Sequence, residues 1–140
     1  MKDDYRGALA RAKSEGKNVL VNFTGYACTN CKWMKANMFP KPAIHDRLGK
    51  FILVDLYTDG TDAASLENQK LQETKFQTVA IPHYAIVRPD ETVIAGFEGL
   101  TKNESEFVTF LDRGLPASVA AATAPDTLQR QIVRLREPAH

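Results

Sequence analysis

Two kinds of hydrophobic pattern alternate along the first 115 residues, and the longer kind has the spacing of amphipathic helices. Apolar side chains recur every three or four positions, which places them on one face of a helix. The segments with this pattern are residues 4–15, 29–39, 43–48, 63–75 and 103–113. Gly16 and Gly49 follow the first and third segments, where glycine commonly ends a helix.

The shorter kind of pattern predicts strands. Four segments are rich in apolar and β-branched side chains, and they cover residues 18–24, 51–57, 84–88 and 92–97. The second of them is apolar almost throughout, as expected of a strand covered on both faces. Pro89 and Asp90 form a turn signal between the last two strands, which we therefore expect to be a hairpin.

The order of these elements predicts an α/β fold with a central mixed sheet of about four strands flanked by helices. Strand–helix–strand connections give a parallel pair, and the hairpin adds an antiparallel pair. Cys28 follows the first strand after a three-residue turn, Gly25-Tyr26-Ala27, and precedes the next helix. Ligand chemistry in open α/β sheets gathers at such strand ends.

The composition of the 140-residue chain is typical of a single globular domain, with 44% hydrophobic and 25% charged residues. Its 18 basic and 17 acidic side chains leave a net charge of +1, so no field of one sign is available to bind nucleic acid. We expect one domain over residues 1–115. An alanine- and proline-rich linker and a short helix, docked on the chain's own domain, are expected in residues 116–140.

No segment has the pattern of a membrane span or of a signal peptide. The longest apolar runs fall short of the roughly 18 residues that a span requires. Residues 1–13 are interrupted by charged side chains, which leaves no apolar signal core. We expect no direct membrane insertion of this segment, and the chain could be one domain of a longer protein.

Both cysteines of the chain, Cys28 and Cys31, form a single C-x-x-C motif. Such a pair is typical either of a redox-active dithiol or of half of a metal site. A structural zinc site usually adds a second C-x-x-C or a spaced histidine pair, and His45, His83 and His140 do not have that spacing. We therefore favour the redox interpretation. A metal-binding module that uses Cys28, Cys31 and His83 is the alternative.

Residues 23–34, Phe-Thr-Gly-Tyr-Ala-Cys-Thr-Asn-Cys-Lys-Trp-Met, resemble the active-site segment of the thioredoxin superfamily. The resemblance is closest to the C-terminal thioredoxin-like domain of the DsbD family of thiol:disulfide interchange proteins. Residues 78–82, Thr-Val-Ala-Ile-Pro, are similar to the cis-proline loop of the superfamily, and residues 96–115 to its closing strand and helix. The resemblance implies a thioredoxin-like fold and no cofactor beyond a redox-active Cys28–Cys31 disulfide.

The two cysteines are expected to have different roles. The thiolate is the attacking species, and free cysteine has a pKa of about 8.5. A thiol at a helix N-terminus faces unpaired N–H groups and the positive end of the helix dipole, which favour its anion. We therefore expect Cys28 to be the exposed nucleophile. Cys31, one turn inside the helix, would be buried and would resolve the mixed disulfide.

Five residues around the pair are candidates for contact with a substrate. Pro82 would lie against the cysteines in a cis peptide bond, where it donates no N–H, and the Ile81 backbone could pair with an extended substrate strand. Tyr26 offers an aromatic face in the turn before the motif, next to Ala27. The resemblance places Gly99 in the lining of the same groove.

Two positions depart from the proteins that the chain resembles, which commonly carry carboxylates there. Asn22 lies six positions before Cys28, and Lys35 lies four positions after Cys31. An amide and an ammonium neither accept the proton of a thiol nor raise its pKa. We expect proton transfer from Cys31 to use water, and both thiols to be more acidic than in relatives that retain the carboxylates.

Two further side chains could modulate the pKa of the thiols. Lys32 lies one turn after Cys28, and its ammonium could approach the sulfur, although a solvated lysine is the simpler interpretation. His83 follows Pro82 and could relay a proton, although the first residue of a strand is the simpler interpretation.

These observations predict a thiol:disulfide oxidoreductase of the protein-disulfide reductase type. The resemblance to the DsbD family implies an electron relay, in which a membrane-embedded donor reduces the pair and the pair reduces extracytoplasmic proteins. We expect a periplasmic or otherwise extracytoplasmic monomer, alone or as a domain of a membrane protein, whose partners are protein thiols and disulfides. The alternatives are a free-standing general thioredoxin, with a cytoplasmic location open, the metal-binding module, and a scaffold whose cysteine pair is incidental.

Overall fold

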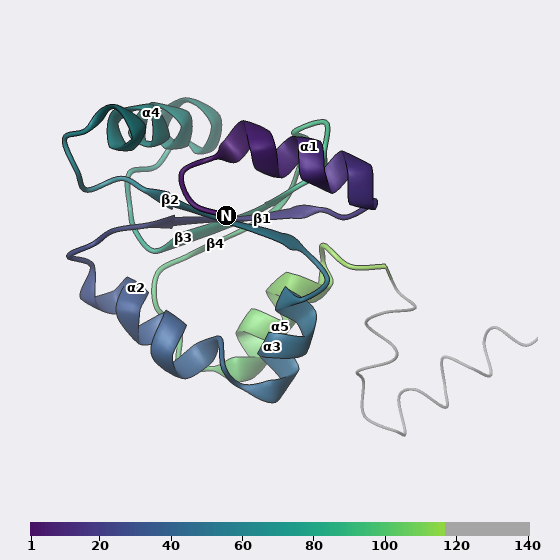
Figure 1. The fold of residues 1–140 in the computed structure, drawn as a ribbon. Helices are drawn as coiled ribbons and strands as arrows, with labels where there is room; N and C mark the ends of the chain where they lie inside the picture. The colour runs from purple at the N-terminus through teal and green to yellow at the C-terminus, as the bar shows by residue number, and fades with distance from the viewer. Residues whose placement is uncertain (117–140) are drawn as a thin grey trace, which may run out of the picture.

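The computed structural model of the protein describes residues 1–116 and has a four-stranded sheet at its centre (Figure 1). The strands are β1 (Val19–Thr24), β2 (Ile52–Tyr57), β3 (His83–Val87) and β4 (Val93–Glu98), in the order β2-β1-β3-β4. β1 and β2 are parallel, whereas β3 is antiparallel to both β1 and β4. The predicted mixed sheet is therefore confirmed. The predicted linker and tail helix lie outside the described residues.

Helices cover both faces of the sheet (Figure 1). They are α1 (Tyr5–Glu15), α2 (Thr29–Trp33), α3 (Pro42–Leu48), α4 (Ala63–Leu71) and α5 (Glu104–Asp112). α1 and α4 lie on one face, and α2, α3 and α5 lie on the other. Short π-helical segments, η1 (Met34–Met38) and η2 (Gln72–Phe76), continue α2 and α4. The sequence predicted these two stretches as uninterrupted α-helix, but the Phe39 N–H bonds to the Met34 carbonyl five residues back and widens the turn.

The two helical layers enclose two hydrophobic cores, one on each face of the sheet. Successive side chains of a strand point to opposite faces. Val19, Val21 and Phe23 therefore pack toward α1, whereas Leu20 packs among side chains of η1, α3 and α5. β3 is buried at all five positions. The central strands β1 and β3 are thus covered on both faces. The expectation that β2 is covered on both faces is wrong, because β2 is the outer strand and its positions alternate between buried and more exposed, with Leu53 40% exposed.

The N-terminal residues extend the sheet beyond what the sequence predicted. Lys2 forms a parallel bridge with Asp55, and the N–H of Asp3 donates a 2.8 Å hydrogen bond to the Asp55 carbonyl. β2 would otherwise be an edge strand with unpaired backbone groups. Residues 1–3 provide hydrogen-bond partners for part of that edge.

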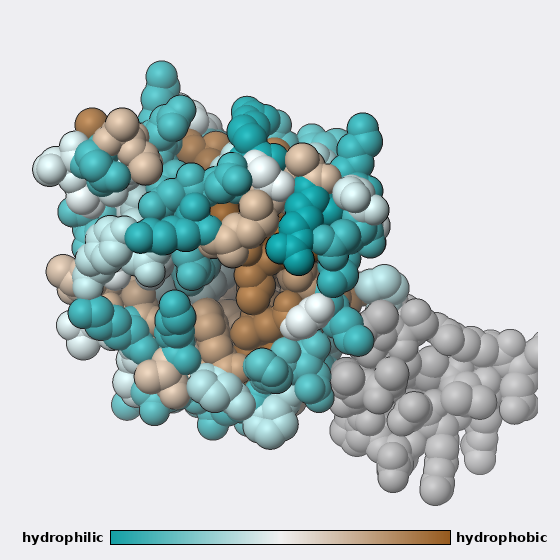
Figure 2. All heavy atoms as spheres, viewed as in Figure 1, coloured by the Kyte–Doolittle hydropathy of each residue, from teal (hydrophilic) through white to brown (hydrophobic). Residues whose placement is uncertain are grey.

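Apolar side chains also line a hollow beside this edge of the sheet (Figure 2). A cavity of about 200 Å³ lies there. Leu20, Phe39, Leu48 and Leu53 are among its lining side chains, and Asp55 adds a charged group. No helix within residues 1–116 is long and apolar enough to cross a membrane.

The loops that matter for function lie together at one end of the strands. β1, β2 and β4 finish at this end of the sheet, and β3 begins there. The Cys28 loop after β1 therefore faces residues 58–62 after β2, residues 77–82 before β3 and residues 99–102 after β4.

Candidate active site

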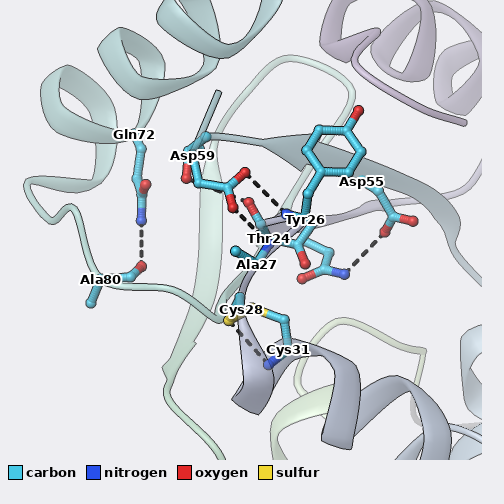
Figure 3. The surroundings of a disulfide bond; sticks show 11 residues. Thr24, Tyr26, Ala27, Cys28, Cys31, Asp55, Asp59, Gln72 and Ala80 are labelled. Atoms are coloured by element: carbon cyan, nitrogen blue, oxygen red, sulfur yellow. Dashed lines mark hydrogen bonds between the residues drawn. A yellow bond between two sulfur atoms is a disulfide. The ribbon is translucent and has the colours of Figure 1, made fainter. Parts of the chain in front are cut away.

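Cys28 and Cys31 form a disulfide at the N-terminus of α2 (Figure 3). Cys28 is the N-cap residue of the helix and is half-buried, whereas Cys31 is only 6% exposed. The backbone N–H of Cys31 donates a 3.1 Å hydrogen bond to the Cys28 Sγ atom. The more accessible sulfur thus lies where unpaired helix N–H groups stabilise negative charge, and the second sulfur lies behind it.

The loop before Cys28 is held by a carboxylate that no sequence motif indicated. The Asp59 side chain accepts hydrogen bonds from the backbone N–H groups of Tyr26, at 3.0 Å, and Ala27, at 2.9 Å (Figure 3). These two bonds hold the pKa of Asp59 below its usual range. In the sequence, Asp59-Gly60 has only the local pattern of a turn.

The predicted proline loop lies before β3, at the same end of the strands as Cys28. The Ile81–Pro82 peptide bond is cis. The buried side chain of Gln72 donates a 2.7 Å hydrogen bond to the Ala80 carbonyl (Figure 3), and the N–H of Gly99 donates a 2.8 Å bond to the Pro82 carbonyl. Gly99 has a φ of +82°, which glycine adopts without strain. Gln72 could not be identified from the sequence, because a single glutamine in a helix carries no pattern.

Asn22 and Lys35, at the two positions that lack the expected carboxylates, both contact the side chain of Asp55. Asn22 Nδ2 donates a 3.0 Å hydrogen bond to Asp55, and the Lys35 ammonium lies 3.9 Å from the other oxygen of that carboxylate. Neither position 22 nor position 35 carries a carboxylate in the sequence. Parallel pairing places Asp55 directly beside Asn22. An acidic group is therefore present next to Asn22 on the adjacent strand.

His83 is the first residue of β3, in line with the simpler interpretation of its sequence position. Its ring is 6% exposed and lies 5.8 Å from the ring of Phe23 and 5.7 Å from that of Phe76, measured between centroids. Burial lowers the pKa of His83, and the Glu98 carboxylate, 3.6 Å from Nδ1, opposes the shift. Within residues 1–116 no three potential metal-ligating side chains lie together, so His83 does not complete a site with the cysteines.

The remaining predicted site residues lie around the disulfide. Tyr26 is 52% exposed and stacks on Tyr57, with ring centroids 4.0 Å apart, and the Lys2 ammonium lies 5.0 Å from the Tyr26 centroid. Lys32 is exposed and interacts electrostatically with Asp59. Tyr26 therefore presents a stacked aromatic surface at the end of β2, and Figure 3 shows its ring pointing away from the disulfide.

The arrangement can carry out one kind of chemistry directly. A thiolate at the Cys28 position can attack an external disulfide, and Cys31 can then displace the product by closing the internal disulfide. This cycle transfers two electrons to the external disulfide.

Comparisons with known proteins agree with the fold. A family model described as thioredoxin-like matches residues 1–89. A thioredoxin from Thermus thermophilus is 22% identical, with 78% of this chain and 82% of that chain covered and a TM-score of 0.65. The reduced C-terminal domain of DsbD from Neisseria meningitidis is 22% identical, with 82% of this chain and 100% of that chain covered and a TM-score of 0.63. A DsbH oxidoreductase is 18% identical, with 77% and 81% of the two chains covered and a TM-score of 0.59. A search of curated proteins gave no match.

Proposed function

The chain belongs to the thioredoxin-like family, and we propose that it is a reductive relay that passes electrons from a membrane-embedded donor to disulfides of extracytoplasmic proteins. The general activity follows from the fold and the Cys28–Cys31 disulfide, which make the protein a thiol–disulfide oxidoreductase. The direction of electron flow, the partners and the location are the proposed part. Their support is the resemblance of residues 23–34 to the DsbD family and the similarity of the fold to the DsbD domain.

In the proposed direction, the Cys28 thiolate attacks one sulfur of a substrate disulfide. A Cys28–substrate disulfide forms, and the other substrate sulfur leaves as a thiolate that takes up a proton. Cys31 then loses its proton and attacks the Cys28 sulfur, which releases the second substrate thiolate and leaves the Cys28–Cys31 disulfide. The substrate gains two electrons and two protons. The membrane donor, itself a dithiol, reduces the pair again by the same exchange.

The observation that carries the exchange mechanism is the asymmetry of the pair. Cys28 caps α2 and is accessible, whereas Cys31 is buried one turn inside the helix. A substrate approaching Cys28 meets Tyr26 and Ala27 on one side and the loop with Ile81 and Pro82 on the other. We propose that these residues, with Gly99, form the substrate-binding surface of a monomer that needs no cofactor.

The first test is the reduction potential of the pair, measured by equilibration with thiol buffers and read through the fluorescence of Trp33. A value near or below about −220 mV supports a reductant, since thioredoxin lies at about −270 mV. A value near about −120 mV, as for DsbA, would reverse the proposed direction of electron flow. Cys31→Ser should trap a Cys28-linked mixed disulfide with a substrate protein, and Cys28→Ser should trap none.

A general thioredoxin is the second candidate, because the fold matches a bacterial thioredoxin as well as it matches the DsbD domain. Such a protein would be reduced by a soluble NADPH-dependent flavoenzyme. Incubation of the oxidised protein with that class of reductase and with a membrane-bound dithiol donor distinguishes the two candidates. Efficient reduction by the flavoenzyme alone would favour the general thioredoxin.

A further inference from the structure

We propose that Asp59 is a positioning residue that holds the Cys28 sulfur at the N-terminus of α2 and thereby keeps the thiol acidic. The inference rests on the exchange activity described above. Asp59 lies 31 positions after Cys28 in the sequence, in the loop that follows β2. It belongs neither to the cysteine motif nor to the proline loop.

The carboxylate acts on the two residues that precede the nucleophile. One Asp59 oxygen accepts the N–H of Tyr26 and the other accepts the N–H of Ala27, at 3.0 and 2.9 Å (Figure 3). Both N–H groups are in an exposed loop, where water could otherwise bond to them. Hydrogen bonds from backbone N–H groups to a carboxylate are charge-assisted and strongly directional. The pair of bonds therefore fixes the orientation of both peptide groups before Cys28.

Asp59 can hold this loop because hydrogen bonds fix the backbone on both sides of it. Thr58, just before it, donates its backbone N–H to the Thr24 carbonyl at the end of β1, at 3.0 Å. The Gln69 side chain donates to the carbonyl of Thr58 and, at 3.5 Å, to that of Gly60. The residues on both sides of Asp59 are thus hydrogen-bonded to β1 or α4, and these bonds fix the position of the backbone that carries the carboxylate.

Gly25 packs closely against the Asp59 carboxylate and leaves no room for a side chain at position 25. A Cβ atom on Gly25 would lie 2.7 Å from Asp59 Oδ2 and 2.9 Å from the Ile81 Cδ1 atom. Any larger side chain would push the carboxylate away from the two N–H groups. Glycine at position 25 is therefore required by the contact with Asp59, and not by its own backbone angles.

Two effects of Asp59 on the Cys28 thiolate oppose each other. Its negative charge disfavours a thiolate nearby, and the exposed ammonium of Lys32 partly offsets that charge. Its hydrogen bonds keep the sulfur at the helix N-terminus, which favours the thiolate. The proposal is that the second effect dominates, so removing the carboxylate should make Cys28 less acidic.

The experiment titrates Cys28 alone, in the Cys31→Ser background, by alkylation rate against pH. Asp59→Ala should lower the rate at neutral pH about two- to fivefold, the factor expected from one lost helix-terminus interaction. Asp59→Asn retains one acceptor oxygen and should lie between Asp59→Ala and the parent. Asp62→Ala removes a carboxylate three residues later whose side chain makes no cap bond, and it should behave as the parent. Amide exchange at Tyr26 and Ala27 should accelerate only in the Asp59 variants.

The outcomes separate the possible roles. Faster alkylation in both Asp59 variants would mean that Asp59 acts through its charge and would overturn the proposal, as would an unchanged rate. Gly25→Ala gives an independent check, because it should slow alkylation in the parent and much less when combined with Asp59→Ala. If the wild-type pair shows no reversible exchange at all, the proposed function fails. If exchange persists without the expected change in rate, only the role of Asp59 fails.

Discussion

Asn22 and Asp55 face each other across the parallel strands β1 and β2, and the Asn22 amide donates a 3.0 Å hydrogen bond to the Asp55 carboxylate. The Lys35 ammonium lies 3.9 Å from the same carboxylate. The amide and the ammonium that replace the carboxylates expected at positions 22 and 35 thus converge on one acidic group. This arrangement gives one negative charge an amide donor and a cation.

Asn22→Asp is expected to destabilise the protein more at high pH than at low pH. The variant places two carboxylates within hydrogen-bond distance, and their repulsion exists only while both are ionised. We expect a loss of about 1–3 kcal/mol in the free energy of unfolding at about pH 8, and a smaller loss at about pH 5. Urea denaturation at both pH values measures it. The double variant Asn22→Asp/Asp55→Asn exchanges the two groups and should recover most of the loss, whereas equal losses in both variants would contradict the explanation.

Gln72→Leu is expected to weaken substrate binding through the loop before β3. Gln72 is 1% exposed, and its amide holds the Ala80 carbonyl in the loop that we propose contacts substrate. Without that bond the loop is no longer fixed in position, so KM for a protein disulfide should rise about three- to tenfold while kcat changes little. Steady-state reduction of a protein disulfide measures both constants.

Asn68→Leu is the matched control for this prediction. Asn68 is a buried amide in α4, four residues earlier, and it donates to Asp3 and to the Tyr57 carbonyl instead of to the loop. Its loss should lower stability without a comparable change in KM. An equal rise in KM in both variants would show that Gln72 acts only through general stability.

Patterns of local sequence were enough to predict the sheet and the position of the disulfide. In β1, Val19, Val21 and Phe23 give one face an apolar row, and Cys28 follows after a turn, so the strand end and the helix N-terminus could be placed from neighbouring residues alone. The C-x-x-C spacing put Cys31 one turn inside the helix, and the structure buries it there.

The contacts that organise the site could not be predicted in this way. Asp59 and Tyr26 are 33 positions apart, as are Asp55 and Asn22, and only the parallel pairing of β1 with β2 brings each pair together. A polar residue after a strand has the same local signature whether it bonds to water or to a distant loop. Nothing in the local sequence therefore indicates that the Asp55 carboxylate lies beside Asn22, the position that lacks the expected carboxylate.

Tyr26→Ala is expected to affect large substrates more than small ones. The exposed ring stacks on Tyr57 and points away from the disulfide, so a folded protein bound at Cys28 can reach it and a small disulfide cannot. Loss of one aromatic contact should lower kcat/KM for a protein disulfide about two- to tenfold, with little change for oxidised glutathione. Leu66→Ala, which truncates another exposed apolar side chain outside the redox loops, should change neither value. A parallel loss with both substrates would indicate damage to the cysteine pair instead.

His83→Phe is expected to flatten the dependence of stability on pH. His83 lies between Phe23 and Phe76, and neither ring nitrogen has a hydrogen-bond partner among residues 1–116. Burial lowers the pKa of His83 in the folded state, against the opposing effect of Glu98. As the pH falls through about 6.5, the unfolded chain therefore binds a proton that the folded protein does not bind. The folded state loses stability over this range, and the loss continues until the pH reaches the lowered pKa of the folded state.

Urea midpoints at about pH 7.5 and about pH 5.5 measure the difference, since these values lie on either side of the ordinary histidine pKa. The midpoint of the wild-type protein should fall more between the two than that of His83→Phe, whose ring can pack among Phe23 and Phe76 without burying unpaired nitrogens. His45→Gln removes an exposed histidine on α3 and should keep the wild-type dependence. If wild type and His83→Phe lose the same stability, the acid sensitivity comes from other groups, and the buried imidazole takes up its proton in the folded state as readily as in the unfolded chain.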